Sequence, residues 1–158
     1  MPLCIYGRAY KLIGLNMARI QIDLQDNYLF TTEMTVRASD LNYGNHVGHD
    51  RILTLMQEAR IQYYRSLGFK SELNFEGAVG QVIADAVVQY KSESYLGDQL
   101  IVKIAVSDFN KYGFDMHYLL TNKLTGKEVA RGKTGIVCFD YDLKKIARIP
   151  EVLKLKLQ

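Results

Sequence analysis

Tryptophan is absent from this chain, and proline and cysteine are scarce, with two residues of each among 158. Cys4 and Cys138 form no paired motif, so we expect no disulfide and a reducing, cytoplasmic location. Apolar runs are far shorter than the roughly 20 residues of a transmembrane helix, which argues against a membrane span. A net charge of +3 is too small to indicate a nucleic-acid partner.

The composition that remains is that of an ordinary globular protein, with 48% hydrophobic and 23% charged residues. This length predicts one domain with its own hydrophobic core. Residues 1–16 have weak periodicity and no convincing signal-peptide cleavage site, so we interpret them as an N-terminal extension. We expect residues 17–158 to form the single domain, with Met17 as an alternative start.

The hydrophobic periodicity predicts a strand, a helix and then four strands. Residues 28–38 mix β-branched and aromatic residues with polar ones, which favours a strand. Apolar residues follow helical spacing over 50–67, and Gly68 is suited to end that helix. Four later strands are predicted at 79–90, 99–109, 113–121 and 128–141. Their short connections indicate an antiparallel meander, and Pro150 starts a short last helix. The predicted class is α+β, with one long helix against a curved antiparallel sheet of about five strands.

The densest group of proton-transfer and hydrogen-bonding side chains lies between the first strand and the helix, in residues 39–50. It comprises Asp40, Asn42, His46, His49 and Asp50. Helix N-termini present unpaired N–H groups and a partial positive charge. A polar loop at such a position is suited to stabilising a developing oxyanion.

Four short motifs occur in order along the chain. They read Asp40-Leu41-Asn42 with His46-Val47-Gly48-His49, Glu58-Ala59-Arg60, Leu67-Gly68, and Tyr90 followed by Gly97-Asp98. Each motif is weak alone. Together, over roughly residues 28–150, their order and spacing resemble the hotdog-fold thioesterases, in the branch of 4-hydroxybenzoyl-CoA thioesterase.

This resemblance implies a homodimer or homotetramer in which one sheet runs across two subunits and wraps the helix. It implies active sites at the subunit interface that act on an acyl thioester of coenzyme A or of acyl carrier protein. A backbone N–H near His49 would donate to the thioester oxygen. Water, a base and an oxyanion donor suffice for this hydrolysis. We therefore expect no metal and no cofactor, since coenzyme A is part of the substrate.

The chain departs from this family at two positions. Many relatives have a catalytic aspartate where this chain has Asn42, and others have a glutamate where it has Gln57. An amide cannot act as a general base. The base is then expected among Asp40, His46, His49, Asp50 and Glu58. Some relatives carry a functional histidine at the position of His46, and others have a histidine at the position of His49.

Each candidate also has a purely structural interpretation. Asp40 and Asn42 can stabilise the turn, and His46 can brace the loop. Asp50 can cap the helix or interact with its dipole, and Glu58 can pair with Arg60 or another basic residue. For the phosphates of coenzyme A, the candidate cations are Lys91, Arg131 and Lys133.

Three functions therefore stay open. The leading one is an acyl-CoA thioesterase, and the second is a hotdog module that binds acyl thioesters without hydrolysing them. The third is an acyl-carrier-protein thioesterase, which differs only in the carrier. A hotdog dehydratase is disfavoured because its glycine- and proline-rich histidine motif is absent.

Overall fold

The computed structural model describes residues 19–158. The N-terminal extension, Cys4 and the alternative start at Met17 lie outside this range. The elements are β1 (Phe30–Thr35), the 3-10 helix η1 (Ala38–Asp40), α2 (His49–Ser66), β2 (Val79–Tyr90), β3 (Gln99–Ser107), β4 (Gly113–Asn122), β5 (Glu128–Asp140), β6 (Lys145–Ile146) and α3 (Glu151–Leu157). The predicted α+β class is confirmed. Within the described range, no helix has the length and apolar character needed to cross a membrane.

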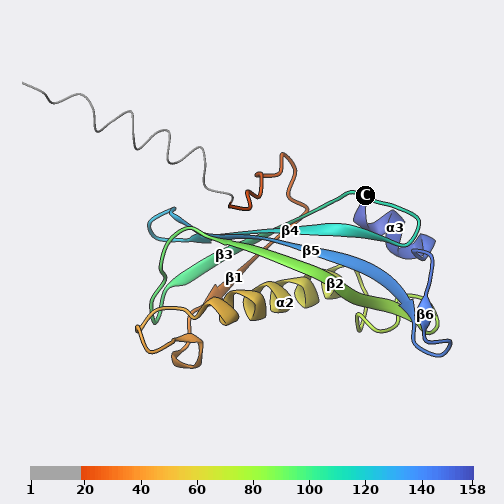
Figure 1. The fold of residues 1–158 in the computed structure, drawn as a ribbon, viewed down its shortest axis with the longest axis horizontal. Coiled ribbons are helices and arrows are strands. Elements are labelled where there is room, and N and C mark those ends of the chain that lie inside the picture. The colour runs from red at the N-terminus through yellow and green to blue at the C-terminus, as the bar shows by residue number, and fades with distance from the viewer. Residues whose placement is uncertain (1–18) are drawn as a thin grey trace, which may run out of the picture.

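The sheet is antiparallel with the strand order β1-β3-β4-β5-β2, and the two-residue β6 pairs with β5. Helix α2 lies along one face of the curved sheet (Figure 1). The predicted meander is correct for β3 to β5 and wrong for β2, which pairs with β5 rather than β3. The reason is that the connection 91–98 does not form a hairpin but leads from one edge of the sheet toward the other, past the start of α2.

The strands follow from the alternation of their side chains. Leu100, Val102 and Ile104 of β3 are fully buried, as every second residue facing a core must be. The first strand is shorter than predicted, because the chain turns into η1 directly after it. The backbone N–H of Arg37 donates to Oδ2 of Asp40 at 2.8 Å and holds this turn.

Helix α2 buries one stripe of apolar side chains, including Ile52, Met56 and Ala59. The helix ends as predicted, with Gly68 at a φ of +89°, which favours glycine. A second glycine, Gly132 of β5, leaves room for the side chain of Met56 from the helix. A Cβ atom at this position would lie 2.4 Å from Cε of Met56.

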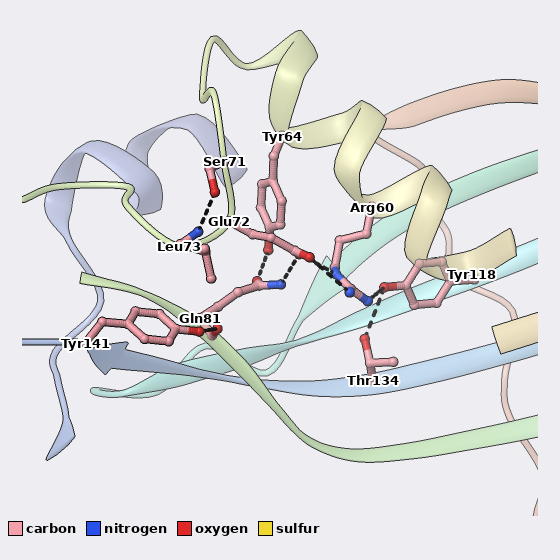
Figure 2. A network of polar contacts seen from close by, with 9 residues as sticks. All are labelled: Arg60, Tyr64, Ser71, Glu72, Leu73, Gln81, Tyr118, Thr134 and Tyr141. Atoms are coloured by element: carbon pink, nitrogen blue, oxygen red, sulfur yellow. Dashed lines mark hydrogen bonds and ion pairs between the residues drawn. The ribbon is translucent and has the colours of Figure 1, made fainter. Parts of the chain in front are cut away.

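A buried polar network joins α2 to the sheet (Figure 2). Arg60 is 5% exposed, and its Nε donates to Oε2 of Glu72 at 2.9 Å. Glu72 also accepts from Nε2 of Gln81 at 2.6 Å, and the hydroxyl of Tyr64 donates to Gln81. Burial opposes the charge on Arg60, but the hydrogen bond to Glu72 and the nearby Tyr118 raise its pKa overall. The network therefore keeps a charged guanidinium inside the core.

Cys138 of β5 is fully buried and free. Burial raises the pKa of its thiol to about 11. Such a protonated thiol is a poor nucleophile at neutral pH.

Candidate active site at the start of helix α2

The polar loop between η1 and α2 is fixed by backbone hydrogen bonds to two segments. The N–H of Gly48 donates to the carbonyl of Asp40 at 2.9 Å, and the N–H of Val47 donates to the carbonyl of Ser94 at 2.9 Å. Ser94 is itself held by Asp98, whose Oδ2 accepts from the serine hydroxyl at 2.8 Å. The Gly-Asp motif thus anchors the 91–98 connection beside the loop.

Asn42 and His46 form a small ring of hydrogen bonds with Gly44. The N–H of Gly44 donates to Oδ1 of Asn42 at 2.8 Å, which leaves Nδ2 of that amide as the donor. Nδ2 lies 3.2 Å from Nε2 of His46, and Nδ1 of His46 lies 3.3 Å from the carbonyl of Gly44. These partners assign the proton to Nδ1 and leave Nε2 as the acceptor. The structural interpretations of Asn42 and His46 therefore both hold, while both side chains still line a cavity.

The first turn of α2 has free N–H groups. The carbonyl of Gly48 accepts from the N–H of Arg51 at 3.0 Å, so the helical pattern begins at Gly48. Within residues 19–158, no acceptor pairs with the N–H of His49 or of Asp50. The hydroxyl of Tyr90 donates to the carbonyl of His49 at 3.1 Å and ties β2 to the helix start.

A cavity of about 360 Å³ opens at this helix start. Its lining comprises Asn42, His46, Val47, His49, Ile52, Tyr90, Lys91, Ser92, Glu93, Ser94 and Val129. The structure thus brings together four of the residues that the sequence singled out, namely Asn42, His46, His49 and Lys91.

Asp40 and Glu58 line a different cavity, of about 470 Å³, between β1 and α2. Residues 49 and 58 lie on opposite sides of a helix, since each residue advances the helix by about 100°. Glu58 accepts from Nε2 of Gln62 at 2.8 Å. The structural interpretation of Glu58 as a partner of Arg60 does not hold, because Arg60 pairs with Glu72 and residues two positions apart on a helix do not face each other.

Asp50 lies in the first turn of α2, as expected, but not in the lining of the cavity at the helix start. Its side chain is 64% exposed, and Oδ2 lies 3.5 Å from Nε of Arg51. This arrangement agrees with the structural interpretation of Asp50 as a partner of the helix dipole.

Arg131 and Lys133, both on β5, also lie outside this cavity. Arg131 Nη2 is 2.8 Å from Oε1 of Glu128, and this hydrogen-bonded partner lowers the pKa of Glu128. Lys133 Nζ is 2.6 Å from Oδ2 of Asp115. Both cations are paired with acidic groups, so Lys91 is the remaining candidate for binding phosphate at this cavity.

A second titratable cluster lies across β3 and β4. Ligand-type atoms of Asp108, Asp115 and His117 lie within 4.8 Å of one another. Lys133 donates into the cluster through Asp115, so an ammonium group already supplies positive charge there. Burial lowers the pKa of His117, and its Nδ1 has no hydrogen-bond partner among the described residues.

The lining contains several residues that sequence reasoning missed. They are Ser92, Glu93 and Ser94 from the connection after β2, and Val129 from β5. Tyr90, a residue of the fourth motif, also lines the cavity. The polar run that follows Tyr90, together with the Gly97-Asp98 motif, was the available signal. The strand order brings this connection to the helix start, and strand order does not follow from local sequence patterns.

Comparison with solved structures finds the same architecture in thioesterases. Slr0204, a 1,4-dihydroxy-2-naphthoyl-CoA thioesterase from Synechocystis, is 22% identical with a TM-score of 0.75, over 81% of this chain and 94% of that chain. YbaW, a probable thioesterase from Escherichia coli, is 23% identical with a TM-score of 0.68, over 80% and 95%. SAV2348 from Staphylococcus aureus, solved in complex with CoA, is 17% identical with a TM-score of 0.75, over 86% and 85%. These similarities confirm the hotdog fold.

A search of curated proteins finds no match. The family model of the thioesterase-like superfamily, however, matches residues 36–157, from the end of the first strand to the last helix. This range contains the polar loop, α2 and all the later strands. The chain therefore belongs to the thioesterase-like superfamily, and it is a thioester hydrolase, as its motifs predicted.

Proposed function

We propose that this protein hydrolyses acyl thioesters of coenzyme A in the cavity at the N-terminus of α2. The observation that carries the proposal is the convergence of Asn42, His46 and His49 on one cavity at the start of α2, where two helix N–H groups have no acceptor among the described residues. A hydrolase needs a place for water, a base and donors for the oxyanion. This cavity offers space for water, histidines that can act as the base, and helix N–H groups that can act as donors.

The helix start supplies the oxyanion donors. With the thioester carbonyl placed at the N–H groups of His49 and Asp50, the negative charge that develops on oxygen meets two donors and the positive end of the helix dipole. A thioester has little of the resonance that protects an amide. Attack by a held water therefore needs no Lewis acid, and the products are a carboxylate and the free thiol of the carrier.

Coenzyme A is the carrier that we favour. Lys91 lines the cavity at the end of β2, where a cation can meet a phosphate. One related structure is named as a naphthoyl-CoA thioesterase and another is a complex with CoA. Acyl carrier protein is the competing carrier, and it would require a docking surface around the same cavity.

We further propose that the site is completed by a second subunit. Strand β2 is an edge of the sheet, and Ile83 on this strand is 40% exposed although it pairs with the buried Ile136. Open edges of this length are normally covered in native proteins. Pairing of two β2 edges would extend the sheet across both subunits and would place partner residues beside the cavity.

A thiol-release assay with acyl-CoAs of different length and polarity tests the proposal, with acyl carrier protein thioesters as the second arm. We expect release from at least one acyl-CoA and a loss of release in His46→Ala. The competing function is binding without hydrolysis, which is favoured by the amides at positions 42 and 57. Binding of acyl-CoA without thiol release from either carrier would establish that alternative and overturn the proposal.

A further inference from the structure

The cavity at the start of α2 contains one carboxylate that no motif identified. Its titratable lining residues are His46, His49, Tyr90, Lys91 and Glu93. Among the described residues in that lining, Glu93 is the only acid. The acids that the family motif led us to consider, including Asp40, Asp50 and Glu58, all lie outside it.

Glu93 is held beside His46 by its surroundings. Its Oε1 lies 3.8 Å from Nδ1 of His46, and its Oε2 accepts from the hydroxyl of Tyr95 at 2.6 Å. The next residue, Ser94, is tied to the loop by the N–H of Val47. The connection therefore carries Glu93 to the imidazole from the side opposite to Asn42.

The imidazole is oriented for such a partner. Nε2 of His46 is the acceptor because the amide of Asn42 donates to it, so the ring proton resides on Nδ1. Nδ1 faces the carbonyl of Gly44 and the carboxylate of Glu93. A carboxylate on the Nδ1 side and a basic nitrogen on the Nε2 side is the arrangement that orients an imidazole and stabilises its charged form.

We propose that Glu93 is the carboxylate of this site and that it activates water through His46. This inference rests on the proposed hydrolysis. Nε2 has one lone pair, so the incoming water replaces the Asn42 amide as its partner. Nε2 then takes a proton from this water as the water oxygen bonds to the thioester carbon, and the carbonyl electrons move to oxygen. When the carbonyl re-forms, the carbon–sulfur bond breaks, and the imidazolium returns its proton to the thiolate. Water and thioester become acid and thiol, with no other reactant.

The electrostatics of the cavity explain why an acid is needed. During the reaction His46 becomes a cation in a cavity that Lys91 and His49 also line, and a nearby like charge disfavours it. Glu93 opposes this effect from 3.8 Å. The side chains of His46 and Glu93 are 32% and 59% exposed in the single subunit, so a bound substrate or second subunit would strengthen the pair by excluding water.

The test compares Glu93→Gln with Glu76→Gln, which removes an exposed acid that lies outside the cavity. General-base catalysis typically contributes on the order of 100-fold or more. We expect Glu93→Gln to lower kcat at least about tenfold with little change in KM, and Glu76→Gln to match the wild type. Glu93→Gly should recover activity with added formate, which restores a carboxylate and would not repair a merely structural defect.

A double-mutant comparison addresses the pair directly. If Glu93 acts through His46, Glu93→Gln should cost little more once His46 is alanine. Losses that multiply in the double variant, or wild-type kcat in Glu93→Gln, would overturn the role of Glu93 while leaving the hydrolase intact. A wild-type protein that releases no thiol from any acyl thioester would overturn both the inference and the proposed function.

Discussion

The side-chain amide of Asn42 donates to Nε2 of His46 across 3.2 Å. This contact places an amide against the basic nitrogen of a histidine, at the position where the family resemblance led us to expect an acid. The orientation of the amide is set by the N–H of Gly44. Position 42 therefore orients His46 in this chain instead of supplying a base, and that relationship makes the site testable by small changes.

Replacing Asn42 by aspartate restores the family carboxylate without changing the size of the side chain. One carboxylate oxygen can still accept from the N–H of Gly44. The other oxygen is also an acceptor, and it faces Nε2 of His46. We expect hydrolysis to extend to lower pH, because an aspartate with an ordinary pKa of about 3.9 stays ionised there. The measurement is kcat/KM against pH. An unchanged profile would mean that residue 42 takes no part.

The identity of the base is tested by the pH dependence of hydrolysis. A histidine base should make kcat/KM rise with pH, whereas a carboxylate base should give a plateau that is already reached at lower pH unless burial raised its pKa. His46→Ala should lose on the order of 100-fold in kcat, whereas His49→Ala, which retains the Glu93–His46 pair, should keep the rise. Loss of the rise in His49→Ala would instead assign the base to His49.

The buried ion pair predicts a large effect on stability. Arg60→Ala leaves Glu72 without its main partner and should lower the free energy of unfolding by about 3–5 kcal/mol. Replacing both residues by methionine should recover much of that loss, since the uncompensated charge is then absent. Urea unfolding measures both. The exposed Arg65→Ala, on the same helix, serves as the control, and an equal loss there would exclude the ion pair as the cause.

His117 should make stability depend on pH. Burial lowers the pKa of His117 in the folded protein, so the folded chain binds fewer protons than the unfolded chain. Stability is therefore complete above the unfolded pKa of about 6.5 and falls as the pH drops toward the folded pKa. His117→Gln should flatten this part of the unfolding free energy measured against pH. Equal slopes in both proteins would show that other groups cause the dependence.

The open edge at β2 predicts an assembly. Light scattering at micromolar concentration should give a mass of at least two chains. Ile83→Glu places a charge on the exposed apolar part of this edge and should shift the protein toward a monomer. Ile146→Glu, at an exposed isoleucine of β6, should not. A monomeric wild type would contradict the proposed completion of the site by a second subunit.

Local patterns predicted most of the fold. The alternation in β3, the apolar stripe of α2 and the glycine after that helix each depend on neighbours in sequence, so they could be read directly. Strand order depends on which distant edges meet. The short connection 91–98 favours pairing of β2 with β3. This prediction of strand order is wrong, because β2 pairs with β5.

The residues of the candidate site also fall into those that local sequence patterns predict and those that depend on strand order. Asn42, His46 and His49 share one loop and helix start, and their common cavity follows from local spacing. Glu93 reaches that cavity through strand order, because the connection after β2 passes the start of α2. The prediction assigned the missing carboxylate to residues near in sequence, Asp40, Asp50 and Glu58. Helix geometry turns Glu58 to the other side of α2, and Asp40 holds the turn of η1.

Gly132 has a consequence for the core although it lies in the sheet. Met56 packs where a side chain at position 132 would stand, and it is two helical turns from His49. A methyl group at position 132 would displace the end of the Met56 side chain, which is flexible and can move aside. Positions 56 and 132 therefore share one volume, and a larger residue at one position would have to be matched by a smaller residue at the other.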